Sequence, residues 1–146
     1  MSGAGQPVTA EELSVGDAGP TIYVADVSTR DFVQYAGASG DFNPIHYDSE
    51  YARGAGYDSV FGQGMLTAGF ASRLATDWFG VAAVRRFRVR FESRVLPGDS
   101  LTVTGTVREI EREGERATVN ADITVVTQDD RTVLTGNVTA TMPTER

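Results

Sequence analysis

The chain has 146 residues, of which 40% are hydrophobic and 23% charged, so its length and composition fit one folded domain and exclude a disordered protein. Its net charge of −7 disfavours nucleic-acid binding, and the absence of lysine excludes a lysine Schiff base. The absence of cysteine excludes disulfides and thiolate chemistry, and a single histidine argues against a zinc or iron centre.

The start of the chain shows no pattern typical of a targeting segment. The first residues have neither a basic segment nor an apolar run, and no later stretch is long enough to span a bilayer. We therefore expect a cytoplasmic protein without membrane contact. Residues 1–146 are expected to form one domain, with flexible ends at 1–9 and 143–146.

The first half of the chain reads as a short strand and two helices. A strand is expected at 21–24, followed by a helix that Ser28 caps and that ends between Gly37 and Gly40. Asp31 supports the start of this helix through its charge and position. A second, shorter helix is expected through residues 51–53, with Asp48 or Ser49 as its cap.

The longest helical pattern runs from Gly64 to Trp78 and ends before Gly80. Large apolar residues recur in it at four-residue spacing, at Leu66, Phe70, Leu74 and Trp78, beside several small residues. This pattern predicts a buried central helix whose backbone approaches its neighbours closely. The apolar stripe is expected to be mainly core.

The second half alternates with a period of two, which is typical of strands with one buried face. Turn signals at 97–99, 113–115 and 128–131 separate the strand patterns. We expect an antiparallel meander with the helices on one side, an α+β arrangement of which the hotdog fold is one form. The strands are expected at 86–91, 101–107, 117–125 and 132–142.

The single histidine, His46, lies five residues after Asp41 in a polar, turn-rich segment. Imidazole and carboxylate groups are readily tuned to exchange protons near neutral pH, which suggests acid/base chemistry on a small molecule. Taken singly, each residue has a structural explanation: His46 as a turn histidine, Asp41 as a turn residue after a helix, and Asn43-Pro44 as a common turn pair. Their joint order favours the catalytic interpretation.

Residues 35–48, Tyr-Ala-Gly-Ala-Ser-Gly-Asp-Phe-Asn-Pro-Ile-His-Tyr-Asp, resemble the signature of MaoC-like hydratases, the (R)-specific enoyl-CoA hydratase family of hotdog proteins. Residues 61–69 resemble the family's second motif, at the start of the central helix. Residues 95–101 resemble its strand-turn-strand element. The resemblance extends from about Val27 to the final strand.

This resemblance implies interconversion of trans-2-enoyl thioesters and (R)-3-hydroxyacyl thioesters. It places the catalytic pair on Asp41 and His46 and a carbonyl-polarising backbone N–H at Gly64, where the dipole of the central helix adds to the effect. Asn43 is expected to orient the pair or its water. Ser72 is expected either to line the site or to bond its own helix backbone.

Gln63 departs from the family pattern, which often has histidine before the helix-opening glycine. An amide forms hydrogen bonds but cannot carry a proton, so we interpret Gln63 as a structural variant. We place it, with Met65, among the substrate-binding positions. The resemblance implies no metal and no cofactor apart from the coenzyme A or phosphopantetheine that belongs to the substrate.

Other functions within this resemblance stay open. They are dehydration on an acyl carrier protein, a thioesterase, and a subunit of a heterodimeric hotdog dehydratase; the presence of both Asp41 and His46 disfavours the last. Hotdog proteins usually dimerise by joining their sheets, and the sheet edges would otherwise be exposed, so the resemblance implies a homodimer or a higher assembly of dimers. Arg86, Arg88 and Arg90 share one strand face, which we interpret as a solvated face, with contacts to substrate phosphates as the alternative.

Overall fold

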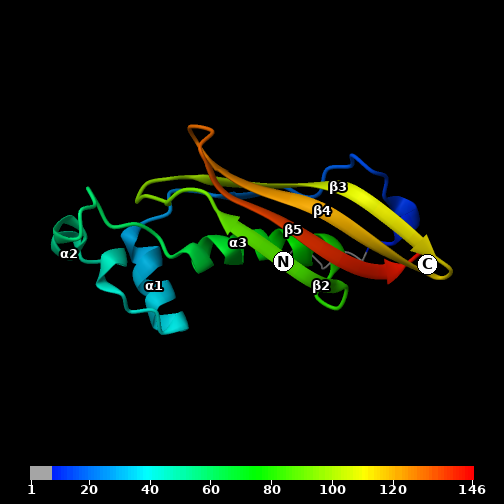
Figure 1. Ribbon diagram of the computed structural model, residues 1–146, viewed down its shortest axis with the longest axis horizontal. Helices are drawn as coiled ribbons and strands as arrows, with labels where there is room; N and C mark the ends of the chain where they lie inside the picture. The colour runs from blue at the N-terminus through cyan, green and yellow to red at the C-terminus, as the bar shows by residue number, and fades with distance from the viewer. Residues whose placement is uncertain (1–7) are drawn as a thin grey trace.

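The computed structural model describes residues 8–146 as one antiparallel sheet that packs against a long helix (Figure 1). The expected flexible start lies mostly outside the described residues. In chain order the elements are a 3-10 turn η1 (Ala10–Glu12), β1 (Ile22–Val24), α1 (Thr29–Ser39), a 3-10 turn η2 (Pro44–His46), α2 (Ser49–Gly54), α3 (Gly64–Phe79), β2 (Val84–Phe91), β3 (Leu101–Glu113), β4 (Arg116–Thr127) and β5 (Thr132–Pro143).

The five strands follow the order β1-β3-β4-β5-β2, and each neighbouring pair is antiparallel. The α+β hotdog fold is thereby confirmed, with α3 along the sheet and the shorter helices α1 and α2 near one end of the molecule (Figure 1). The prediction of a simple meander is wrong outside β3–β5. β2 crosses to pair with β5, so Phe87 faces Val138, and the turn at 97–99 does not join neighbouring strands.

The central helix α3 packs on the sheet mainly through small side chains. Its buried residues are Thr67, Ala68, Ala71, Leu74, Ala75 and Phe79. Of the predicted apolar stripe, only Leu74 is fully buried, whereas Leu66, Phe70 and Trp78 are half-buried against the core. The alanines are buried because a helix approaches a sheet most closely through small residues. Trp78 fits because Gly105 has no side chain: a Cβ there would lie 2.9 Å from the indole ring.

The outer face of the sheet is polar. Arg86, Arg88 and Arg90 on β2 are exposed, as the interpretation of a solvated face expects, and Arg90 Nε lies 3.5 Å from a Glu92 carboxylate oxygen. β2 is an edge strand whose only sheet partner in the described chain is β5. One long edge of the sheet is thus unpaired.

The first described residues of the chain form a hydrogen-bonded turn. The backbone N–H of Thr9 donates to a Glu12 carboxylate oxygen at 2.8 Å, and this bond is the main cause of the lowered pKa of Glu12. Thr9 itself is buried. Residues 8 and 9 therefore pack against the domain in this structure.

No helix among residues 8–146 is long and apolar enough to cross a membrane.

Candidate active site

The loop that carries Asp41 starts where α1 ends at Gly40. Gly40 adopts φ 79°, a left-handed conformation that glycine takes without strain, and its N–H donates to Ala36 O at 2.9 Å. Ser39 Oγ then accepts from the Asp41 N–H at 3.1 Å. These bonds turn the chain sharply, so the Asp41 side chain projects from the end of the helix as the sequence predicts.

Asn43 holds the next turn together. Its side-chain oxygen accepts from the Ile45 N–H at 3.1 Å, which caps the 3-10 turn η2, and Pro44 opens that turn. Its backbone N–H donates to Asp41 Oδ1 at 3.3 Å. The contact with the predicted pair is therefore made by the Asn43 main chain, while its amide side chain shapes the loop.

His46 is buried at the end of this turn, with 8% of its surface exposed. Its Nδ1 lies 2.8 Å from the carbonyl oxygen of Phe61. A carbonyl oxygen only accepts hydrogen bonds, so Nδ1 carries the proton and the neutral ring has its lone pair on Nε2. The Phe61 ring also packs edge-on against the imidazole, with centroids 5.5 Å apart. Phe61 thus fixes both the tautomer and the orientation of His46.

The structure brings Asp41 and His46 together. His46 Nε2 lies 3.6 Å from Asp41 Oδ2, slightly beyond direct hydrogen-bond distance. A carboxylate oxygen and an unprotonated Nε2 are both acceptors, so a molecule with two O–H groups, such as water, can donate to both at once. The aspartate side chain is 46% exposed and the histidine side chain 10%, which leaves the pair open on the aspartate side.

Gln63 is buried and is not among the residues that line the cavity described below. Its side chain is buried, Nε2 donates to the Phe32 carbonyl at 2.9 Å, and Oε1 has no hydrogen-bond partner within residues 8–146. It precedes α3 but does not cap that helix with its side chain. Within the described chain, the Gly64 N–H has no hydrogen-bond acceptor and is available to a ligand.

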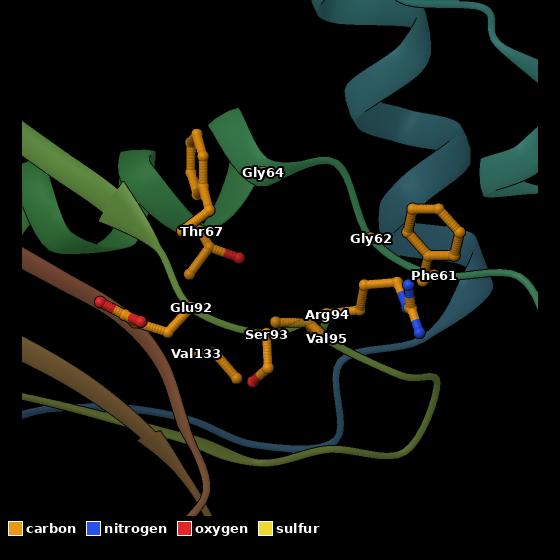
Figure 2. A pocket seen from close by; sticks show the side chains of 10 residues that line it. Phe61, Gly62, Gly64, Thr67, Glu92, Ser93, Arg94, Val95 and Val133 are labelled. Carbon is orange, nitrogen blue, oxygen red and sulfur yellow. The ribbon is translucent and has the colours of Figure 1, made fainter.

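A cavity of about 430 Å³ opens beside the first turn of α3 (Figure 2). Gly64 and Thr67 line its helix side, and the end of β2 with the following loop lines the other. Asp41 and His46 are not among its lining residues, but Phe61 joins the two features because it contacts His46 and also lines the cavity. The lining residues are Phe61, Gly62, Gly64, Thr67, Phe91, Glu92, Ser93, Arg94, Val95 and Val133.

Two further predicted residues lie apart from this cavity. Ser72 is half-buried, and its hydroxyl donates to Gly69 O at 2.8 Å within its own helix. Met65 is 60% exposed on the first turn of α3. Sequence reasoning gave no role to Thr67 or Arg94. Thr67 follows Gly64 by three residues, a spacing that places both on one helix face, whereas no local pattern marks Arg94.

Comparison with known proteins shows the family of this chain. Residues 11–129 match the model of the MaoC like domain. The chain belongs to the MaoC-like dehydratase family. It is also 32% identical over 119 residues to an (R)-specific enoyl-CoA hydratase of Rhodospirillum rubrum, covering 80% of this chain and 81% of that protein. The motif at 35–48 thus marks a true MaoC-like domain.

Longer proteins contain the same domain. The chain is 31% identical over 121 residues to the mouse peroxisomal multifunctional enzyme type 2, covering 78% of this chain but 16% of that enzyme. Among solved structures, an unliganded (R)-hydratase of Pseudomonas aeruginosa superposes with a TM-score of 0.78 at 26% identity, covering 96% of this chain and 92% of that chain. MaoC-like proteins of this kind act on enoyl or hydroxyacyl thioesters.

The groups at the site can transfer protons and form hydrogen bonds. Residues 8–146 contain no group of three or more histidine, cysteine, aspartate or glutamate side chains placed to hold a metal ion. The groups near the site are instead a carboxylate, an imidazole and a free helix N–H. Together they can hold a water molecule, move its proton and polarise a carbonyl group.

Proposed function

We propose that this protein hydrates trans-2-enoyl-CoA thioesters to (R)-3-hydroxyacyl-CoA thioesters and catalyses the reverse dehydration. The observation that carries this proposal is the pairing of His46 Nε2 with Asp41 Oδ2 at 3.6 Å, with Nδ1 committed to Phe61 O. The Rhodospirillum relative supports the choice of enoyl-CoA as the substrate and of the (R) product.

In the proposed mechanism, Asp41 and His46 hold the attacking water through its two O–H groups. As the water oxygen bonds to C3, one of its protons passes to the pair, and the pair delivers a proton to C2. The Gly64 N–H donates to the thioester oxygen, which gains negative charge as electrons move from the double bond. Water is added across the double bond, and the pair returns to its starting protonation state.

The purified protein is expected to remove the absorbance of a trans-2-enoyl-CoA thioester and to form the (R)-3-hydroxyacyl product. Chiral analysis of the product checks the stereochemistry, and a saturated acyl-CoA serves as the control for thioesterase activity. Release of free thiol without hydration would contradict the proposal. A much higher kcat/KM for a carrier-bound substrate would reassign the enzyme to acyl-carrier-protein chemistry.

We further propose that two copies join through their β2 edges. Within residues 8–146 the outer edge of the eight-residue strand β2 has no partner, and Met65 and Phe91, which adjoin Gly64, are 60% and 50% exposed in the single chain. Apolar exposure of this kind beside an unpaired strand is typical of a surface that a partner covers. Light scattering is expected to give twice the chain mass of 15.6 kDa. A monomer at working concentrations would contradict this prediction.

A further inference from the structure

Arg94 lies at the rim of the cavity, one aromatic ring away from the proposed catalytic histidine. Its guanidinium carbon is 4.7 Å from the centroid of the Tyr57 ring and 5.4 Å from that of Phe61, which itself contacts His46 (Figure 2). No carboxylate forms a salt bridge with Arg94 within residues 8–146. Its contacts are therefore aromatic faces, which hold a cation without neutralising it.

A second arginine holds the loop that carries Arg94. Arg131 donates to the Arg94 carbonyl oxygen at 2.6 Å and to Ser93 Oγ at 3.0 Å. It also pairs with the buried Asp99 carboxylate at 2.8 Å. Arg131, itself anchored by Asp99, thus holds both the Arg94 carbonyl and the neighbouring Ser93 hydroxyl.

The cavity contains a second polar group without a partner. Thr67 is 5% exposed, and its hydroxyl makes no hydrogen bond to any residue that the structure describes. Figure 2 shows this hydroxyl pointing into the cavity, one helical turn from Gly64. Both groups are open to water in the single chain, and a purely aliphatic ligand would displace that water without replacing its hydrogen bonds, whereas a polar ligand group can replace them.

Glu92, a carboxylate residue that lines the cavity, contacts Thr135 and Arg90 rather than Arg94. Glu92 accepts from Thr135 Oγ1 at 3.1 Å and faces Arg90 on β2. In Figure 2 its side chain points away from that of Arg94. The charge that the cavity presents beside Phe61 is therefore positive.

We propose that Arg94 selects acyl thioesters whose acyl chain ends in a carboxylate. The inference depends on the proposed hydratase function and adds its substrate class. With the thioester oxygen at Gly64 and C3 at the Asp41–His46 pair, Arg94 donates to the distal carboxylate and Thr67 offers a further hydrogen bond. A phosphate of coenzyme A lies at the far end of the long pantetheine arm. Arg94, by contrast, contacts the Phe61 ring, which in turn contacts His46. The acyl end of the substrate is thus the nearer anion.

The test compares two coenzyme A thioesters of equal chain length, glutaconyl-CoA and trans-2-pentenoyl-CoA, which differ in a terminal carboxylate or methyl group. The wild type is expected to have the higher kcat/KM for glutaconyl-CoA. Arg94→Met is expected to lower the ratio of the two kcat/KM values by about tenfold or more, the effect of losing a charge-assisted hydrogen bond. Arg94→Lys, which keeps the charge, is expected to restore part of the ratio. Arg73→Met, an exposed arginine on α3 paired with Asp77, is the matched control and is expected to leave the ratio unchanged.

The outcomes separate the inference from the function on which it depends. Hydration of pentenoyl-CoA without a preference for glutaconyl-CoA would overturn the inference and leave the hydratase function standing. An equal loss for both substrates in Arg94→Met would also overturn it, because it would assign Arg94 to the shared coenzyme A part or to the fold. If the wild type hydrates neither substrate, both proposals fail. Circular dichroism shows whether each variant is folded.

Discussion

Asp41→Asn and His46→Gln are each expected to lower kcat for enoyl-thioester hydration by about 10² to 10⁴-fold, the usual contribution of general acid/base catalysis. Asparagine keeps the shape of Asp41 and can still accept from the Asn43 N–H, but it is a much weaker base. Glutamine in place of His46 keeps a hydrogen-bonding group but cannot take up a proton at Nε2. The hydration assay measures the loss directly.

The two changes are also expected to be strongly non-additive, because both residues bind the same water. The double variant is expected to be about as slow as the worse single variant. Asp48→Asn is the matched control: Asp48 lies two residues after His46 but caps α2 by accepting from the Glu50 and Tyr51 N–H groups. Near-normal kcat in either single site variant, with the fold intact, would refute the proposed pair.

Phe32→Ala is expected to give a large loss of stability, about 3–5 kcal/mol in the free energy of unfolding. Phe32 is completely buried on α1, and its ring packs directly on the backbone of Gly62, where a Cβ would lie 2.9 Å away. Removing the ring leaves a cavity between α1 and the loop that precedes α3. Denaturant unfolding at fixed protein concentration measures the change, with a fall of roughly 10 °C in Tm as the thermal counterpart.

The neighbouring residue provides the control. Val33 is 51% exposed on the other side of the same helix, so Val33→Ala is expected to change stability by less than about 0.5 kcal/mol. The Phe32 variant is also expected to lose activity, because the loop under its ring carries both the Phe61 carbonyl that holds His46 and the Gly64 N–H. Equal stability of the two variants would show that the Phe32 ring does not support this loop.

Local patterns predicted the elements of this fold well. The cap at Ser28, the stop at Gly40 and the helix from Gly64 to Gly80 all depend on nearby residues and were found where the sequence places them. Strand pairing was harder to predict, because a turn signal says that the chain reverses but not which strand it joins. The pairing of β2 with β5 connects residues about fifty positions apart, and no local pattern in either strand specifies it.

In the candidate site, too, local features could be predicted from the sequence and long-range contacts could not. Asp41 and His46 were found because they share one short segment, and the structure places them together. Phe61 O, which sets the tautomer of His46, is a main-chain atom fifteen residues away and has no side-chain signature. Arg94 lines the cavity from a loop that Arg131, just before β5, contacts from a distant part of the sequence. Such contacts arise from tertiary structure, which a motif does not encode.

The strand order also has a consequence for how the protein is made. β1 pairs with β3 and β2 pairs with β5, so both edge strands are synthesised before the strands on which they pair. A nascent chain that lacks Thr132–Pro143 has no strand on which β2 can pair. Closure of the sheet at this edge must therefore wait for the C-terminal strand, and until then the apolar residues of β2 lack their sheet partner.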